Sequence, residues 1–318
     1  MKLITFQSKK AQCLGVSVGD WVLDLNAAFD EHIGGSFGDR SGPCSFDMLS
    51  FLETGARGLK QAQKSLKDAG RLVDEDEVAT LKKRGILYGM DDVKLKAPIP
   101  RPRKNIVCLG LNYAEHIAEG SRVRQQERPL PEYPIYFTKP PTAVTGPYDD
   151  IIYPRATGRL DYEAELAFVI GKGGKNIPEE EAYNYIAGYT VFNDVSARDL
   201  QSRHGQWYKG KSCDTFAPMG PCLVTRDEVM DPMDLDLWLK VNGETRQSSN
   251  TSNMIFNVQK IVASLSEGMT LEVGDIVATG TPSGVGYAHP SGLLKVGDVI
   301  EIWIEGIGTI RNRVVAES

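Results

Sequence analysis

The chain of 318 residues lacks several features that would place it in a specialised class. Its five cysteines are odd in number and contain no Cys-x-x-Cys pair, which argues against a disulfide framework or a zinc site. No stretch approaches the roughly 20 apolar residues of a membrane span, and the first apolar run is too short for a secretory signal. We therefore expect reduced thiols and a soluble, cytoplasmic protein with no membrane partner.

Positive charge and histidine are also scarce. The chain has 36 lysines and arginines against 42 aspartates and glutamates, a net charge of −6, and only 4 histidines. Such a balance provides no general attraction to the phosphate backbone of nucleic acids. We expect no nucleic-acid partner.

The length exceeds the size at which one hydrophobic core usually stops growing, so we expect a large domain and a smaller one. The first part of the chain carries short strand patterns and then a mainly helical pattern over 46–69, which is typical of a small α+β unit. A proline-rich, basic stretch from Ala97 to Lys104 follows. The boundary is placed there, which gives domains of 1–97 and 98–318.

The second domain is predicted to be rich in strands. Apolar runs that favour strands cover 105–110, 276–279, 299–304 and 309–315. Asn242-Gly243 between two further runs indicates a hairpin, and helices are expected over 178–187 and 254–265. Strands and helices do not alternate regularly, which argues against a doubly wound parallel sheet. The pattern predicts a β-rich α+β fold.

Three acids stand beside predicted strands. Glu163 and Glu165 run straight into an apolar stretch, and Asp194 follows a second one. Residues two apart in a strand share a face at about 7 Å, so both glutamates can converge on one point. Such acids on a solvent-facing strand commonly do nothing, but acids at the ends of buried strands are costly unless paired or metal-bound. Oxygen-only ligands select a hard cation, so the set predicts an Mg²⁺ or Mn²⁺ site, with Ca²⁺ as a further candidate.

His116 and Glu119 lie three residues apart in a segment that begins a predicted helix near Tyr113. This spacing places both on one helix face, where the carboxylate would orient the imidazole and suit it to deprotonate water. An ordinary exposed pair would show the same spacing. The segment 120–134 that follows is predicted to be a mobile surface loop able to close over a pocket.

The arginines of this loop leave two interpretations open. Arg122, Arg124 and Arg128 either hold a distal carboxylate of a substrate or are simply solvated. The sequence does not decide between them.

Two glycine-bearing segments suggest phosphate or carboxylate binding. Residues 205–212 match the phosphate-loop pattern letter for letter, but no buried strand precedes them and no helical pattern follows, so we reject a nucleotide site. Lys211 can still be a positioned cation beside a substrate oxyanion. In 279–286, backbone N–H groups and Thr281 could cradle a carboxylate, although a tight turn would have the same composition.

Six segments in order resemble the fumarylacetoacetate hydrolase family over about 105–315. They are Gly110-Leu111-Asn112-Tyr113-Ala114-Glu115-His116, Phe137-Thr138-Lys139-Pro140, Asp161-Tyr162-Glu163-Ala164-Glu165-Leu166, Phe192-Asn193-Asp194-Val195-Ser196-Ala197-Arg198-Asp199, Gly210-Lys211-Ser212 and Thr279-Gly280-Thr281-Pro282. The N-terminal segment resembles a variable extension that some members carry. The implied fold is a mixed β-roll with a catalytic metal at its mouth, usually in a homodimer.

The resemblance also implies roles for residues of this chain. Glu163, Glu165 and Asp194 match the family's metal carboxylates. The founding hydrolases have a further aspartate ligand upstream of the histidine, and Asn112-Tyr113 occupies that region here. We therefore expect three protein ligands, with water completing the coordination shell.

The remaining roles concern the substrate. By the resemblance, His116 with Glu119 matches the dyad that activates water, and Lys211 matches the lysine that polarises the substrate carbonyl or enolate. Gln201 and Thr281 match positions that contact substrate oxygens. The substrate implied is a small 2-oxo or diketo acid that chelates the metal.

Three functions remain in view. The first is hydrolysis of a C–C bond in an acylpyruvate or related diketo acid, as in aromatic catabolism, which the pair of His116 and Glu119 favours. The second is an oxaloacetate decarboxylase or a 2-oxo acid isomerase or tautomerase, which needs the stabilised enolate but no attacking water. The third is a non-catalytic binder of small dicarboxylates.

Overall fold

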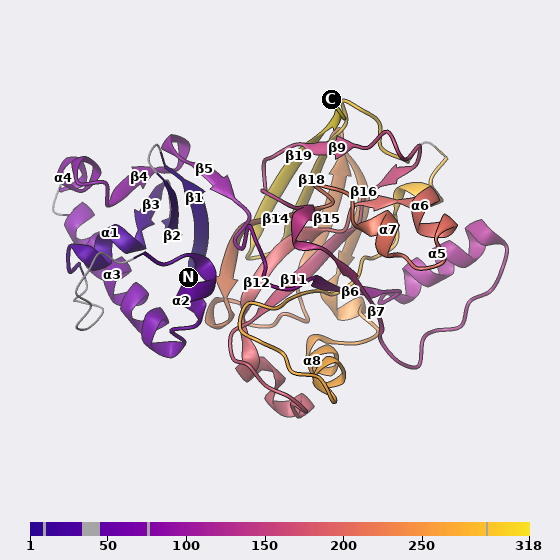
Figure 1. The fold of residues 1–318 in the computed structure, drawn as a ribbon, viewed down its shortest axis with the longest axis horizontal. Helices are drawn as coiled ribbons and strands as arrows, with labels where there is room; N and C mark the ends of the chain where they lie inside the picture. The colour runs from indigo at the N-terminus through magenta and orange to yellow at the C-terminus, as the bar shows by residue number, and fades with distance from the viewer. Residues whose placement is uncertain (9–10, 34–44, 75–76, 291) are drawn as a thin grey trace.

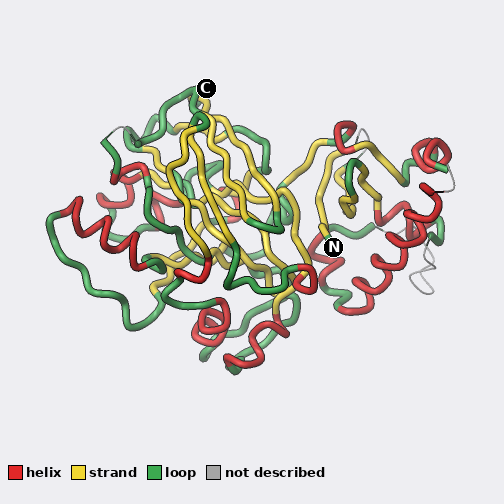
Figure 2. Tube along the Cα trace, turned by 180° about the vertical axis from the view of Figure 1, so that it is seen from behind, coloured by secondary structure: helices red, strands yellow, loops and turns green. Residues whose placement is uncertain are grey.

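The computed structural model describes residues 1–8, 11–33, 45–74, 77–290 and 292–318. Figure 1 shows a smaller N-terminal unit beside a larger unit, and Figure 2 shows strands filling the centre of the larger unit with helices around them. The β-rich α+β fold is therefore confirmed. Within the described residues, no helix has the length and apolar character needed to cross a membrane.

The N-terminal unit confirms the predicted strands and helices. Its strands are β1 (Lys2–Gln7), β2 (Gln12–Val18), β3 (Trp21–Asp24), β4 (Leu87–Gly89) and β5 (Lys94–Lys96). Its helices are α1 (Leu25–Asp30), α2 (Met48–Leu52), α3 (Ala56–Asp74) and α4 (Val78–Lys83). Side chains set two helix starts: Asp24 accepts from Ala27 N–H before α1, and Asp47 accepts from Ser50 N–H before α2.

The larger unit holds the remaining strands. They are β6 (Ile106–Gly110), β7 (Ile135–Lys139), β8 (Val144–Thr145), β9 (Ile151–Tyr153), β10 (Leu160–Asp161), β11 (Ala164–Ile170), β12 (Ile186–Asn193), β13 (Ser196–Ala197), β14 (Ala217–Thr225), β15 (Asp236–Val241), β16 (Glu244–Asn250), β17 (Ile276–Ala278), β18 (Val299–Ile304) and β19 (Gly308–Ala316). The α-helices are α5 (Ala114–Arg124), α6 (Arg198–Arg203), α7 (Tyr208–Lys211) and α8 (Val258–Ser266).

One sheet runs through both units. Its main path is β4-β3-β2-β1-β14-β12-β11-β17-β6-β7, and β1 joins the two parts by pairing with β14, with Leu3 opposite Leu223. Most pairs are antiparallel, but β17 and β6 are parallel, so the sheet is mixed. The domain boundary at residue 98 stays a prediction. A second sheet has the order β16-β15-β18-β19-β9.

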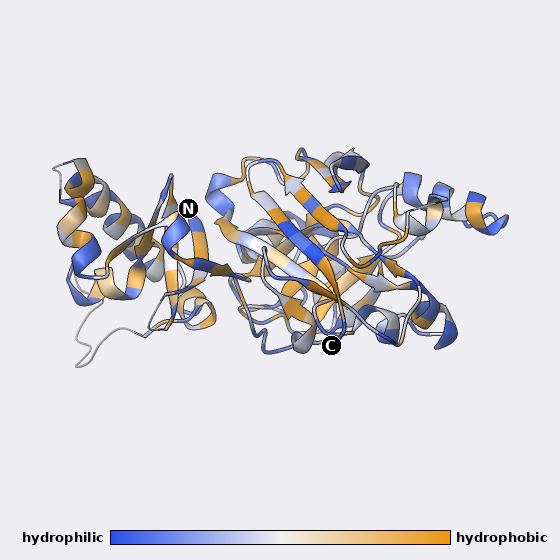
Figure 3. Cartoon of the chain, turned by 90° about the horizontal axis from the view of Figure 1, so that it is seen from above, coloured by the Kyte–Doolittle hydropathy of each residue, from blue (hydrophilic) through white to orange (hydrophobic). Residues whose placement is uncertain are grey.

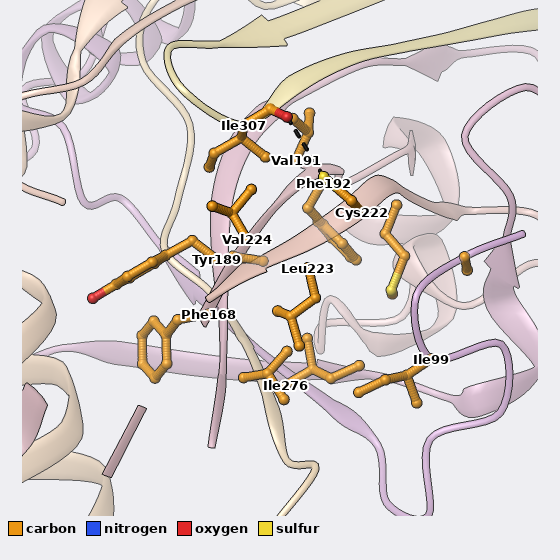
Figure 4. Close-up of a cluster of buried hydrophobic side chains, with 14 of the residues drawn as sticks. Ile99, Phe168, Tyr189, Val191, Phe192, Cys222, Leu223, Val224, Ile276 and Ile307 are labelled. Carbon is orange, nitrogen blue, oxygen red and sulfur yellow. Dashed lines mark hydrogen bonds between the residues drawn. The ribbon is translucent and has the colours of Figure 1, made fainter. Parts of the chain in front are cut away.

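The core lies around the central strands β11 and β12. All seven residues of β11 are buried, as expected of a strand covered on both faces. Figure 4 shows Phe168, Val191 and Leu223 among the packed side chains of this region. Figure 3 shows that strands and outer helices each carry both hydrophobic and hydrophilic residues, as expected of elements with one buried face.

Three predicted segments differ from the structure. The predicted loop 120–134 begins inside α5, because that helix continues to Arg124. The helix predicted over 178–187 is a 3₁₀ helix, η3 (Glu179–Tyr185), since β12 already begins at Ile186 and leaves little length. The helix predicted from residue 254 starts at Val258, because the Asn257 side chain caps it by accepting from Lys260 N–H.

Other local predictions are confirmed. Asn242 and Gly243 have φ values of 53° and 81°, as a tight hairpin turn between β15 and β16 requires. Cys13, Cys108, Cys213 and Cys222 are free thiols, while Cys44 lies outside the described residues.

Candidate active site

Strand pairing brings the three predicted metal ligands together. Glu163 directly precedes β11, Glu165 is its second residue, and Asp194 directly follows the antiparallel partner β12. The N–H of Asp194 donates to the carbonyl of Glu163 at 2.9 Å, which closes the end of the strand pair. One carboxylate oxygen from each acid lies within 4.8 Å of the other two, and all three side chains are buried.

The oxygens of Glu165 show why a cation fits here. Its Oε2 accepts from Gly280 N–H at 2.8 Å, but its buried Oε1 has no hydrogen-bond partner among the described residues. Burial and the neighbouring carboxylates of Asp194 and Glu163 raise the pKa of Glu165 well above its ordinary value. Glu165 thus converges with two other acids and keeps one oxygen unpartnered. Such a group suits a hard divalent cation, which would bind this oxygen and offset the repulsion.

Two buried lysines also reach this carboxylate group. Lys211 Nζ lies 2.8 Å from Glu163 Oε2 and 2.7 Å from Asp194 Oδ2. Burial lowers the pKa of Lys211, but attraction to Asp194 and Glu163 outweighs it, so the net pKa is raised and the ammonium group is retained. Lys139 Nζ donates to Asp194 Oδ1 and, at 2.9 Å, to the carbonyl of Val195.

The contacts of Lys139 were not predicted from sequence. It appeared only inside a motif that carried the family resemblance, without a role. Only the structure shows that Lys139, the last residue of β7, is fully buried. Burial lowers its pKa below the ordinary lysine value. A fully buried lysine requires an acidic partner to remain charged, and Asp194 is that partner.

A buried ion-pair network, which the sequence patterns did not predict, lies beside the three acids. Arg198 Nε lies 2.7 Å from Asp161 Oδ2, and Arg198 Nη2 lies 2.7 Å from Glu163 Oε1. Burial alone would raise the pKa of Glu163, but Lys211 and Arg198 pull it well below the ordinary value. Glu163 is therefore a fixed negative charge.

The glycine-rich segment 279–286 performs a different task from the one expected. Its N–H groups do bind carboxylates, but these belong to the protein. Gly280 N–H donates to Glu165, Gly284 N–H to Glu119 at 2.9 Å, and Gly286 N–H to Asp161 at 2.6 Å. The segment thus orients three acids of the site. Thr281 lies within it, buried, with its Oγ1 accepting from Gln247 Nε2 at 2.8 Å.

His116 and Glu119 lie on α5 as predicted, but they are not hydrogen-bonded. His116 Nδ1 is 3.5 Å from Glu119 Oε2, and neither atom has a hydrogen-bond partner among the described residues. Glu119 is anchored through its other oxygen by Gly284 N–H. His116 therefore stands beside a fixed carboxylate with its ring nitrogens uncommitted.

Close packing of the helices α6 and α7 places Gln201 and Lys211 beside each other near the acids. A Cβ on Gly210 would lie 2.4 Å from the backbone nitrogen of Gln201, so only glycine permits this close approach. The segment 205–212 has no strand before it and only the four-residue α7 within it, which agrees with rejecting a nucleotide loop. Asn112 takes no place among the acids, because its side chain bonds the backbone of Phe256 and Thr279.

One cavity of about 500 Å³ lies beside the three acids, of which only Glu163 lines it, and Glu119 does not line it either. The predicted residues that line it are His116, Glu163, Gln201, Lys211 and Thr281. Phe137 and Trp207 form an aromatic part of the wall, with ring centroids 5.4 Å apart. The arrangement can bind a small anion, place a cation and an imidazole against it, and move a proton.

Comparison with known proteins places this geometry among enzymes. The family model described as fumarylacetoacetate (FAA) hydrolase C-terminal matches residues 105–315. Oxaloacetate tautomerase YisK of Bacillus subtilis strain 168 is 50% identical over 232 residues, which cover 72% of this chain and 75% of that protein. The mitochondrial oxaloacetate tautomerase fahd2 of Xenopus laevis is 40% identical over 322 residues, covering 99% of this chain and 90% of that one.

Solved structures agree over the whole length. Fumarylacetoacetate hydrolase from Exiguobacterium antarcticum has a TM-score of 0.79 and 35% identity, with 100% of both chains covered. Maleylpyruvate hydrolase from Sphingobium sp. SYK-6, solved in complex with manganese(II) ion and pyruvate, has a TM-score of 0.70 and 28% identity, again with 100% of both chains covered.

Proposed function

The chain belongs to the fumarylacetoacetate hydrolase family, and from that membership we propose that it is a metal-dependent tautomerase that interconverts the enol and keto forms of oxaloacetate. The observation that carries the proposal is the buried, converging group of Glu163, Glu165 and Asp194. Lys211 contacts two of these acids, Glu163 and Asp194, and shares one cavity with Glu163 and His116. C–C hydrolysis was the first expectation from sequence. The names of the two relatives favour the second expectation instead.

Glu163, Glu165 and Asp194 would hold the cation, which we propose to be Mg²⁺ or Mn²⁺, with Ca²⁺ as a weaker candidate. The unpartnered Oε1 of Glu165 supports this assignment. When bound, such a cation supplies a Lewis acid beside the 2-oxo group and its neighbouring carboxylate.

The protein residues would handle charge and protons. Lys211 Nζ lies against Glu163 and Asp194 and lines the cavity, so its ammonium group is placed to stabilise negative charge on the substrate oxygen at C2. In ketonisation the enol oxygen loses a proton and C3 gains one. We assign the transfer at C3 to His116 Nε2, since Nδ1 faces Glu119.

Gln201 and Thr281 are proposed to orient the substrate. Both line the cavity, and each already has one partner within the protein. The Oε1 of Gln201 accepts from Arg198 Nη1 at 3.2 Å, which leaves its amide N–H₂ to donate to a substrate oxygen. The hydroxyl hydrogen of Thr281 is likewise available, because its oxygen acts as the acceptor for Gln247.

A second candidate is hydrolysis of an acylpyruvate. The adjacency of His116 and Glu119 favours it, because the same imidazole could deprotonate a water for attack on the distal carbonyl. The structural relative named as a maleylpyruvate hydrolase supports the same possibility. Decarboxylation of oxaloacetate would use the binding mode proposed for its tautomerisation. The two reactions differ in the bond that breaks, which is a C–C bond in decarboxylation.

Three parallel assays separate these reactions. Decay of enol-oxaloacetate is followed by its ultraviolet absorbance, carbon dioxide release reports decarboxylation, and acylpyruvate loss reports hydrolysis, each with Mg²⁺, with Mn²⁺ and with a chelator. Metal without protein is the control. We expect tautomerisation to exceed the other two rates and to vanish with the chelator. Acylpyruvate cleavage without faster enol decay would promote the hydrolase, and binding without any turnover would indicate a non-catalytic binder.

Assembly as a homodimer and a cytoplasmic location remain predictions. Sedimentation of the purified protein would test the first. Fractionation of the source cells would test the second.

A further inference from the structure

The cavity carries a second group of positive charges that the proposed chemistry does not use. Arg124 ends α5, Arg128 lies in the loop after it, and Arg159 directly precedes β10. All three line the same cavity as Glu163 and Lys211, although they come from separate parts of the chain. The sequence left open whether the loop arginines bind a carboxylate or are simply solvated. The groups around them in the structure bear on this question.

The charge partners of the cavity cations divide into two classes. Arg198 and Lys211 bind buried carboxylates of Asp161, Glu163 and Asp194. In contrast, no acid within the described parts of the chain forms an ion pair with the guanidinium of any of the three arginines. The nearby carboxylate of Asp199 is already engaged, since it accepts from Thr157, Gly158 and Leu200.

The backbone around Arg159 is held firmly. Its carbonyl accepts from Arg198 N–H at 3.0 Å, and its own N–H donates to Thr157 Oγ1 at 3.1 Å. Gly158 N–H donates to Asp199 at 3.1 Å. An arginine that starts from a fixed backbone loses less entropy when its side chain binds a ligand.

Arg124 is linked to the carboxylate group through one aromatic ring. Its guanidinium carbon lies 5.9 Å from the ring centroid of Tyr287, and that of Arg198 lies 4.8 Å from the same centroid. Arg198 in turn contacts Glu163. The ring of Tyr287 and the side chain of Arg198 therefore separate Arg124 from Glu163.

We propose that Arg124 and Arg159, assisted by Arg128, bind the substrate carboxylate that is distal to the 2-oxo group. This subsite would make the enzyme selective for 2-oxo dicarboxylates over 2-oxo monocarboxylates, and it rests on the proposed function. A guanidinium presents paired N–H donors that match a carboxylate, and a ligand carboxylate supplies the counter-charge that the protein does not.

The test compares oxaloacetate with its 4-methyl ester, which keeps the 2-oxo acid group but lacks the distal charge. Arg124→Gln and Arg159→Gln are made singly and together, with Arg122→Gln as the matched control. Arg122 lies on the same helix but does not line the cavity, and its Nε donates to Ala118. We expect each cavity variant to raise KM for oxaloacetate about tenfold while KM for the ester and both kcat values stay unchanged.

A binding readout keeps the subsite separable from the catalytic proposal. Calorimetry with Mg²⁺ gives the ratio of Kd for pyruvate to Kd for oxaloacetate, whether or not the chain is a tautomerase. The ratio should exceed one in the wild type and in Arg122→Gln, and collapse toward one in the double variant. An unchanged ratio in the double variant, or an equal rise of KM for the ester, would overturn the subsite even with tautomerase activity intact.

Discussion

Buried acids occur in both units of the molecule, but they differ in what surrounds them. Asp24 in the N-terminal unit and Glu165 in the larger unit are both buried, and burial raises the pKa of each. Asp24 caps α1 by accepting from Ala27 N–H and belongs to no cluster of acids among the described residues. Glu165 converges with two other acids and keeps one oxygen unpartnered.

The comparison shows that burial of a carboxylate does not by itself identify a functional site. A helix N-terminus can hold a single buried acid with backbone N–H groups alone. Three acids that share one point cannot be held in that way, because their repulsion grows as water is excluded. Convergence together with an unsatisfied oxygen is the informative feature, and it occurs in the larger unit.

The largest expected effect on kcat comes from removing the positive charge of Lys211, which contacts two of the converging acids. Lys211→Met should lower kcat by about 100-fold to 1000-fold, because the cation that stabilises the substrate oxygen is removed. Lys209→Met is the matched control, since Lys209 lies on the same short helix and is exposed. Steady-state kinetics check the result, with circular dichroism to verify folding. Equal losses in both variants would contradict the assignment.

Removal of the imidazole should have a smaller but still large effect. His116→Ala is expected to lower kcat by about 100-fold, because the proton at C3 would have to come from water. Its affinity for Mn²⁺ should stay near the wild-type value, since His116 is not among the converging acids. Unchanged turnover would show that His116 has no role in the proton transfer.

Substituting alanine for one glycine in each unit should change the free energy of unfolding in opposite directions. Gly210→Ala should lower the free energy of unfolding by about 1–3 kcal/mol, because the added methyl meets the Gln201 backbone at 2.4 Å. Gly70→Ala within α3 should raise it by about 0.5–1 kcal/mol, since a methyl there meets open space and alanine favours the helix. Urea denaturation measures both. Destabilisation by Gly70→Ala, or none by Gly210→Ala, would contradict the packing described.

The smallest effect concerns Asp24 and depends on pH. Because burial raises the folded-state pKa of Asp24 above 3.8, the wild type loses stability as pH rises from the unfolded-state pKa through the folded-state pKa. Asp24→Asn keeps an oxygen for Ala27 N–H and removes the charge. The variant should therefore gain stability relative to wild type as the pH rises above 4, with kcat unchanged. A difference in unfolding free energy that is flat with pH would contradict this account.

Sequence patterns predicted the parts of the fold that depend on local chemistry. The convergence of Glu163 and Glu165 could be foreseen because strand periodicity places both on one face. The approach of Asp194 depends on the pairing of β11 with β12. The hairpin at Asn242-Gly243 could be foreseen because its turn requires positive φ. Each of these two signals comes from residues that are neighbours in the chain.

Contacts between distant segments could not be predicted in the same way. The ion pair of Arg198 with Asp161 depends on the pairing of β10 with β13, which short-range patterns do not specify. The contact of Lys139 with Asp194 spans 55 positions. The use of Gly280, Gly284 and Gly286 as donors to the site's acids likewise required the three-dimensional arrangement.

We propose that the three converging acids bind one divalent cation. Titration of Mn²⁺ into the wild type, Glu165→Gln and Asp24→Asn, followed by the electron paramagnetic resonance signal of the free ion, measures this binding. We predict one ion per chain in the wild type and in Asp24→Asn, and loss of that binding in Glu165→Gln. Equal Mn²⁺ binding in Glu165→Gln and the wild type, or none in the wild type, would contradict the account.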